Sequence, residues 1–238
     1  FVADVSYSRS SLSAIPYLQY RRGIEVVGKE ITPTLRPVST MTELTRLKAA
    51  NPDYIFCTFG MDAMTVTLKD AANLGITGSK FVVDWYSGAE SAVEGAGVAA
   101  AEGMMTWSPW ARACDTDIAG VKTLLDYNRT LHDGELDLAR NSSQYIYGWS
   151  TLMVQCKAVE KALETVSYDE LTSEAVWKYG IGKTKNMKTD GLFAPITWDI
   201  EATGTAGSAG RLGTTAVRMY RVENGKFVRI SDWTPAPI

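Results

Sequence analysis

Short apolar runs alternate with amphipathic segments along the first half of the chain. The segments between the runs place apolar residues three or four positions apart, as at Met64, Leu68 and Ala71, which is typical of helices packed on one side. Five strands that alternate with helices predict an α/β fold with a doubly wound parallel sheet, covered on both faces. The strand-like runs cover residues 1–5, 24–31, 54–58, 80–84 and 103–107.

Local signals mark where some of these elements begin and end. Thr40 and Glu43 have the spacing of a capping box, which predicts a helix that begins at this threonine. Near the end of the chain, Asn224-Gly225 separates two strand-like runs, residues 215–222 and 226–230. This dipeptide predicts a hairpin with a two-residue turn.

The middle of the chain has a different pattern, with three predicted helices and no predicted strand between residues 115 and 188. The helices cover residues 115–131, 142–165 and 168–179. Such helices pack their apolar sides against another element, so we expect them to cover a sheet that this sequence does not contain. The second helix carries the longest apolar stripe, formed by Tyr145, Trp149, Leu152, Cys156, Val159 and Leu163.

Composition and charge narrow the class of protein. The 238 residues are 45% hydrophobic and 21% charged, as in globular proteins, and the formal net charge is −3. Nucleic acids and anionic membrane surfaces are bound by basic faces, so neither is expected as a partner. No apolar run approaches the ~18 residues that span a bilayer.

Few residues offer the chemistry of an enzyme or a metal site. His132 is the only histidine, which excludes sites with several histidine ligands, and no GxSxG sequence accompanies it. Residues 95–100 match the dinucleotide fingerprint, but a predicted helix precedes them and a strand follows, the reverse of the required order. Cys57 and Cys156 lie in apolar patterns and are expected to be packing residues, whereas Cys114 lies in a loop. We expect no catalysis, no cofactor and no metal.

Aromatic side chains gather at the carboxyl ends of the predicted strands, where doubly wound sheets bind their ligands. Tyr7 follows the first strand, Phe59 the third, and Trp85 and Tyr86 the fourth. Aromatic, mostly apolar surfaces are typical of clefts for small molecules. Asp84 ends the fourth strand at the same edge, and two roles are open for it: capping the turn that follows, or contacting the ligand.

Several segments, taken in their order, resemble the extracytoplasmic solute-binding proteins of ABC importers, of the branched-chain amino acid (leucine, isoleucine, valine) type. The resemblance runs along the whole chain. It is carried by residues 4–8 (DVSYS), 44–56 (LTRLKAANPDYIF), 71–75 (AANLG), 101–104 (AEGM), 147–149 (YGW), 191–198 (GLFAPITW), 217–222 (VRMYRV) and 231–233 (SDW).

In that family, which has the type I periplasmic-binding or Venus-flytrap fold, two α/β lobes close over a solute by hinge motion. The resemblance assigns residues 1–110 and 191–238 to the second, ligand-facing lobe, and residues 111–190 to helices of the first lobe. The N-terminal sheet of the first lobe has no counterpart in this sequence. We therefore expect the chain to be the C-terminal part of a longer protein whose precursor has a signal peptide. Alone, it would bind solute poorly and expose the stripe of residues 145–163.

The resemblance also implies which residues contact the solute. Tyr7 matches a tyrosine that faces the solute, and residues 59–61 match a loop of the cleft. Trp85 stands where the amino acid binders have the acidic residue that takes the ligand's ammonium group, so the resemblance does not extend to this feature. Asp84 is the neighbouring alternative, although strand alternation turns it to the other side. The implied ligand-binding set is Tyr7, Phe59, Gly60, Met61, Asp84, Trp85 and Tyr86.

The implied function is to capture a small solute, an amino acid or a related organic molecule, for an ABC importer. The partners would be the solute and the permease subunits, with membrane association only through the permease. The location would be periplasmic or otherwise extracytoplasmic, which is compatible with a membrane-anchored lipoprotein. Two alternatives stay open: a sensor of the same fold that reports a solute to a signalling partner, and an enzyme on a doubly wound sheet.

Overall fold

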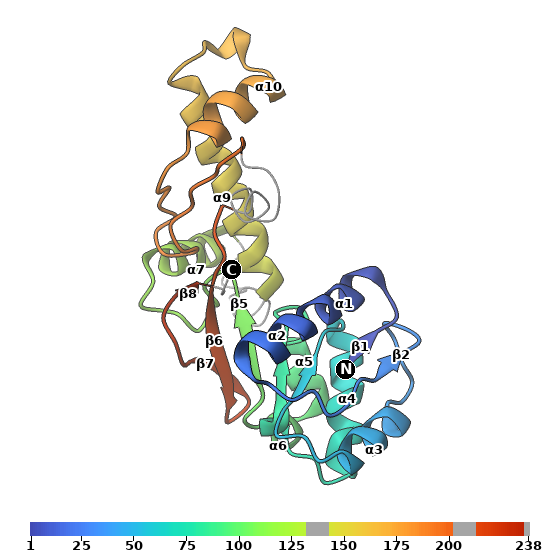
Figure 1. The fold of residues 1–238 in the computed structure, drawn as a ribbon. Helices are drawn as coiled ribbons and strands as arrows, with labels where there is room; N and C mark the ends of the chain where they lie inside the picture. The colour runs from blue at the N-terminus through green and yellow to red at the C-terminus, as the bar shows by residue number, and fades with distance from the viewer. Residues whose placement is uncertain (132–142, 202–212, 236–238) are drawn as a thin grey trace. The chain divides into compact units, whose positions relative to one another are not determined.

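The computed structural model describes residues 1–131, 143–201 and 213–235 (Figure 1). Two compact units divide the chain: residues 1–107 and 219–230 form the first, and residues 108–218 and 231–238 form the second. The chain therefore passes from one unit to the other three times, after residues 107, 218 and 230. The assignment of lobes from the sequence stays a prediction.

The first unit is built on parallel strands in the order β2-β1-β3-β4-β5. Strands β3 (Ile55–Cys57), β4 (Phe81–Val83) and β5 (Met105–Ser108) pair side by side. Strand β1 (Val2–Ala3) pairs with β2 (Ile31–Thr32), and a parallel bridge from Val2 to Thr58 sets it beside β3. The predicted α/β fold with a parallel sheet is confirmed.

A hairpin extends the sheet beyond β5. It consists of β6 (Ala216–Glu223) and β7 (Lys226–Arg229), and the short β8 (Thr234–Pro235) pairs with the start of β6. Asn224 and Gly225 form the predicted two-residue turn, both with positive φ, at 53° and 75°. These values suit a type I′ turn, whose twist matches that of the flanking strands.

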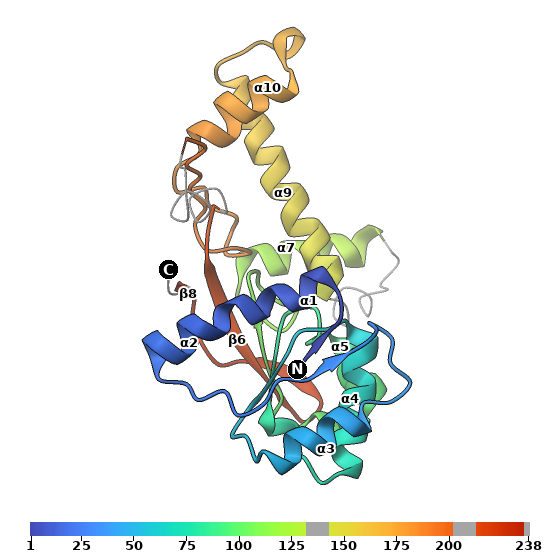
Figure 2. The ribbon, with the colours of Figure 1, turned by 45° about the vertical axis from the view of Figure 1, so that its right-hand side comes forward.

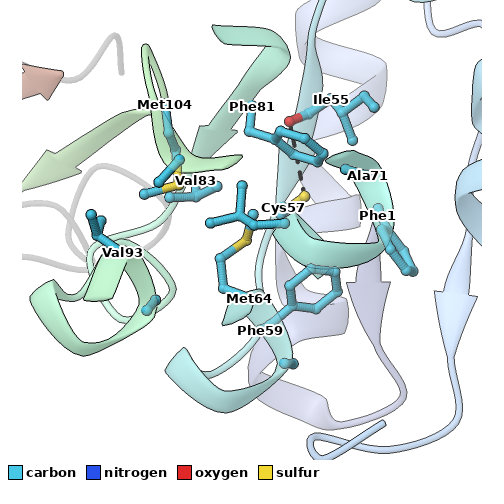
Figure 3. Packing of buried hydrophobic residues seen from close by; sticks show 14 of the residues in the cluster. Phe1, Ile55, Cys57, Phe59, Met64, Ala71, Phe81, Val83, Val93 and Met104 are labelled. Carbon is cyan, nitrogen blue, oxygen red and sulfur yellow. Dashed lines mark hydrogen bonds between the residues drawn. The ribbon is translucent and has the colours of Figure 1, made fainter. Parts of the chain in front are cut away.

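The core of the first unit lies between one face of the sheet and the helices α3 (Met41–Ala49), α4 (Met61–Asn73) and α5 (Glu90–Ala96). Figures 1 and 2 show these helices side by side. Figure 3 shows the buried side chains that they enclose with the strands. The short α6 (Val98–Ala101) follows α5 and leads toward β5.

The other side of the sheet is less completely covered. It carries α1 (Ser6–Ser10), the 3₁₀ turn η1 (Ser11–Ala14) and α2 (Ile15–Arg22), of which only Ser8 is buried (Figure 2). Phe56 of β3 is correspondingly exposed. The connection from β1 to β2 thus lies on one face of the sheet, and the helices α3, α4 and α5 lie on the other. Right-handed crossovers require this, because the chain moves from β1 to β2 in one direction across the sheet and from β2 to β5 in the other.

The strand predicted at residues 24–31 is wrong in extent, because only β2 at its end forms. The backbone N–H groups of Val2 and Asp4 donate to the carbonyl oxygens of Glu30 and Thr32, at 3.0 and 2.8 Å. Of the apolar residues earlier in the segment, Ile24 and Val27 are exposed and Val26 is half-buried. An edge segment with no second neighbour and no buried face has little to hold it in a strand.

The helix predicted after Thr40 is present, but its capping box is not. Asp70 of α4 accepts hydrogen bonds from the backbone N–H and the hydroxyl of Thr40, at 2.6 and 3.3 Å. This tertiary contact takes the place of the local bond with Glu43, and it ties the start of α3 to α4.

The second unit contains α7 (Ala119–Leu131) and α9 (Ser143–Leu163). The single helix predicted at residues 168–179 is wrong. Its place is taken by three short helical segments, η3 (Tyr168–Glu170), α10 (Ser173–Ala175) and η4 (Val176–Gly180), and η5 (Ile181–Lys183) follows them. The interruption has a local cause, since Ser167 caps η3 through a capping box with Glu170 and Thr172 caps α10 anew.

The apolar stripe of α9 is partly exposed, as predicted, at Leu152 and Leu163. The residues that α9 buries are mostly small, and a Cβ at Gly180 would lie only 2.2 Å from the carbonyl oxygen of Ala158, so η4 packs closely on this helix. Cys156 is exposed, contrary to its predicted packing role, whereas Cys57 is buried in the core. No described helix is both long and apolar enough to cross a bilayer.

A buried ionic and aromatic cluster joins three segments of the second unit. The guanidinium of Arg218, 5% exposed, lies 3.6 Å from a carboxylate oxygen of Asp115 and 4.3 Å from the ring centroid of Trp233. Each of these residues stands close to one of the three passages of the chain between the units. We call Asp115, Arg218 and Trp233 the Arg218 cluster.

Candidate ligand-binding site

The order of the parallel strands determines where a ligand would bind. From β1 the chain moves outward to β2, whereas from β3 it moves the other way to β4 and β5. The connections that leave the carboxyl ends of β1 and β3 therefore diverge, and in doubly wound sheets ligands bind at this switch point. Tyr7 follows β1, and residues 59–61 follow β3.

The predicted aromatic residues come together at this edge. The rings of Tyr7 and Tyr86 lie edge to face with their centroids 6.5 Å apart, and those of Trp85 and Tyr86 are 5.4 Å apart. A Cβ at Gly60 would lie 3.3 Å from the Tyr86 ring, so the glycine allows this ring to approach the backbone of the β3–α4 connection. We call Tyr7, Trp85 and Tyr86 the aromatic surface.

Asp84 lies beneath this surface and caps the turn that follows β4. Its side chain is 2% exposed. One carboxylate oxygen accepts a hydrogen bond from the backbone N–H of Ser87 at 2.8 Å, and the other accepts one from the hydroxyl of Tyr7. Of the two roles that the sequence left open, the structure shows the capping role.

The same hydrogen bond affects the titration of both partners. Burial raises the pKa of Asp84, although the bonds from Ser87 and Tyr7 act in the opposite direction. Burial and the hydrogen bond to Asp84 also raise the pKa of Tyr7, so this phenol keeps its proton at neutral pH.

Two buried hydroxyl residues that were not predicted complete the network. The backbone N–H of Phe59 donates to the hydroxyl of Ser87 at 2.8 Å, and the hydroxyl of Thr106 donates to the carbonyl oxygen of Asp84 at 3.1 Å. The ends of β3, β4 and β5 are thereby joined. A serine three residues after an aspartate is a turn signal that could have identified Ser87.

The remaining predicted residues differ in their surroundings. Phe59 is fully buried and packs edge to face against Phe1, with centroids 4.7 Å apart. Met61 is half-buried at the start of α4 and accepts a hydrogen bond on its sulfur from Ser91 at 3.3 Å. His132 lies outside the described residues. Within the described ranges, no three side chains of the His, Cys, Asp and Glu types gather as a metal site would require.

Comparison with known families gives one match along most of the chain. A family model described as periplasmic binding protein matches residues 1–226. A comparison with curated protein sequences finds no match.

Solved structures share the fold at low sequence identity. A branched-chain amino acid ABC transporter protein from Thermus thermophilus, with bound valine, is 20% identical with a TM-score of 0.77. An ABC transporter substrate-binding protein from Aeropyrum pernix gives the same values, and a fatty acid ABC transporter substrate-binding protein from Thermomonospora curvata gives 17% and 0.74. Each match covers 99% of this chain, which spans 60%, 59% and 56% of those proteins, respectively. These likenesses show the type I periplasmic-binding fold.

Proposed function

Because the chain belongs to the periplasmic binding protein family, we propose that it acts as the solute-binding component of an ABC importer. It captures a small organic solute in an extracytoplasmic space, closes on it by hinge motion, and presents the closed form to the permease subunits. The family is one of binding proteins, so the chain is not an enzyme.

The aromatic surface at the switch point carries this proposal. Tyr7, Trp85 and Tyr86 offer ring area to a ligand, and Gly60 and Met61 border them on the β3–α4 connection. Small-molecule sites are mostly apolar and aromatic, with a few polar groups that fix orientation. In the proposed site, Phe59 and Asp84 lie underneath and hold the contacting residues in place.

The buried hydroxyl groups at this edge are suited to structure rather than catalysis. The hydroxyl of Ser87 accepts from a backbone N–H, and Tyr7 donates its proton to Asp84. Both groups are held in hydrogen bonds at the strand ends, and the raised pKa of Tyr7 disfavours the deprotonated form that a nucleophile needs. This arrangement favours binding over chemistry.

The fold leaves the identity of the solute open. One of the similar structures holds valine, and another belongs to a protein named for fatty acids. Ligand choice in this chain therefore depends on its own side chains at the switch point, chiefly the aromatic surface.

A ligand screen tests the proposed function. The product of the intact gene is screened by thermal shift and calorimetry against amino acids, amides, aromatic acids, fatty acids and short polyols. At least one class should raise the melting temperature, and Trp85→Ala should weaken that binding about tenfold, the value of one stacking contact of about 1.4 kcal/mol. Tyr20→Ala is the control, because Tyr20 is 84% exposed on α2.

Absence of any shift across the panel would contradict a receptor function. Neighbouring genes distinguish transport from sensing: permease and ATPase genes support the importer, and a kinase gene without them supports the sensor.

A further inference from the structure

We infer that the part of the solute that contacts the first unit is an uncharged apolar or aromatic group, and that it is not the ammonium group of an amino acid. This inference rests on the proposed function and names its ligand class. Two observations support it: the carboxylate of Asp84 is hydrogen-bonded within the protein, and the surface above it is aromatic.

Asp84 is not available to a ligand cation. Both of its carboxylate oxygens accept hydrogen bonds from within the protein, one from Ser87 and one from Tyr7, and the side chain is 2% exposed. A ligand ammonium could reach it only by displacing Tyr7. That displacement would leave a buried polar group without its partner.

Two exposed carboxylates in the neighbouring connections are already in ion pairs. Asp4, after β1, lies 2.5 Å from Arg9, and Asp62, in the first turn of α4, lies 3.3 Å from Arg36. Glu90, in the first turn of α5, is half-buried, and its contribution is tested by substitution below. Among the residues that the structure describes, an ammonium placed on the aromatic surface would lose its water without a carboxylate shown to be directed at it, which is unfavourable.

The aromatic surface suits an apolar group instead. Tyr7 is 45% exposed, and Trp85 and Tyr86 are half-buried, with their rings inclined to one another at 83° and 51°. Because Tyr7 donates its only hydroxyl proton to Asp84, it has no proton to donate to a ligand, and its exposed ring is its main contact surface. Rings in such arrangements bind flat or branched apolar groups by packing against faces and edges.

Matched pairs of ligands test this inference on the product of the intact gene. Phenylalanine is compared with 3-phenylpropanoate, and leucine with 4-methylpentanoate, since each pair differs only by the ammonium group. Calorimetry should show that at least one compound without the ammonium binds, and about tenfold or more tightly than its amino acid. Tighter binding of the amino acids would overturn the inference while leaving the receptor function intact.

Two further outcomes have separate meanings. Binding of benzyltrimethylammonium but not 3-phenylpropanoate would show that the rings hold a cation, and would overturn the inference. If all four paired compounds and the wider panel fail to bind, the proposed function itself fails.

Variants test the positioning role of Asp84 with the ligand that binds. Asp84→Asn and Tyr7→Phe should each weaken ligand binding by about tenfold or less. Both substitutions affect the same hydrogen bond, so the double variant should bind the ligand as well as the poorer of the two single variants. Asp62→Asn and Glu90→Gln are matched controls and should leave binding unchanged. Selective loss of an amino acid ligand in Asp84→Asn or Glu90→Gln would identify that carboxylate as an ammonium acceptor and overturn the inference.

Discussion

Asp84 shows how a single acidic residue at a ligand-binding edge can serve the protein instead of the ligand. Its side chain links the start of the β4–α5 connection to Tyr7, and its backbone carbonyl accepts bonds from Gly88 and Thr106. Loss of this carboxylate would therefore disturb the β4–α5 connection and its link to Tyr7 together, whereas the bonds to the backbone carbonyl would stay. The structural role of Asp84 is recognised from its hydrogen bonds, because an acidic side chain at this position could equally contact a ligand.

The pH dependence of stability should report this burial. Burial raises the pKa of Asp84 above its ordinary value of 3.8. A carboxyl group with a raised pKa binds its proton more tightly in the folded state, so its contribution to stability is fully present below the ordinary pKa and is lost as the pH rises through the folded-state pKa. We expect the unfolding free energy of the wild type, relative to Asp84→Asn, to be highest near pH ~3.5 and to fall toward pH 7.

Urea denaturation of both proteins at a series of pH values measures this difference. Comparison with the variant removes the contribution of all other carboxylates. A difference that grew in favour of the wild type as the pH rose would contradict the assignment.

Among the elements, those with strong local signals were predicted well and those that depend on neighbours were not. The hairpin at Asn224-Gly225 formed where its turn dipeptide placed it. The strand at residues 24–31 failed, because its apolar residues have no buried face to join. The capping box at Thr40 failed, because Asp70, thirty residues away, accepts from the backbone N–H that Glu43 would take and from the hydroxyl as well. A local sequence pattern shows neither whether a segment finds a buried face nor whether a distant residue accepts its hydrogen bonds.

Substitution of Gly225 tests the turn of the hairpin. An alanine there would have to adopt a φ of +75°, and its Cβ would lie 2.7 Å from a methyl group of Val98. We expect Gly225→Ala to lower the unfolding free energy by about 1–3 kcal/mol, measured by urea denaturation.

Gly148 in α9 provides a control of opposite sign. A Cβ at Gly148 meets nothing within 4 Å, and the residue lies inside a helix. Gly148→Ala should therefore raise the unfolding free energy by up to about 1 kcal/mol. Equal effects of the two substitutions would contradict the structural assignment of the turn.

At the scale of the molecule, the Arg218 cluster gathers three segments close to where they leave the first unit. The guanidinium of Arg218 lies over the ring of Trp233 and close to the carboxylate of Asp115. The sequence predicted that the chain passes between two lobes more than once, but no local pattern indicated that Asp115, Arg218 and Trp233 meet. The contact between Asp115 and Arg218, which are distant in the sequence, follows from the topology of the chain, and the order of the elements predicts the passages but not which side chains meet.

Removal of the Arg218 guanidinium should destabilise the second unit. Arg218→Met leaves the carboxylate of Asp115 buried without this cation, and we expect a loss of about 3–5 kcal/mol in unfolding free energy. Arg218→Lys keeps the charge but not the planar stack, so its loss should be smaller. Arg221→Gln, in an exposed pair with Glu223, is the control and should change stability by less than about 1 kcal/mol.

The candidate site was more predictable than this cluster. Strand ends and aromatic residues placed Tyr7, Trp85 and Tyr86 at one edge, because carboxyl ends of parallel strands lie together whatever the rest of the fold does. The burial of Phe59 and the bond from Tyr7 to Asp84 were not predicted. They depend on side-chain directions at the strand ends, which a sequence pattern does not specify.

The three passages of the chain also affect the order in which the first unit can be completed on the ribosome. Strand β5 is synthesised early, but β6, its partner beyond that edge, begins only at Ala216, and β7, which pairs with β6, follows it. Until then β5 is an unpaired edge strand, the kind of surface that recruits other chains into aggregates. The first unit is therefore complete only when this hairpin has been made, and until then one edge of its sheet is open to other chains.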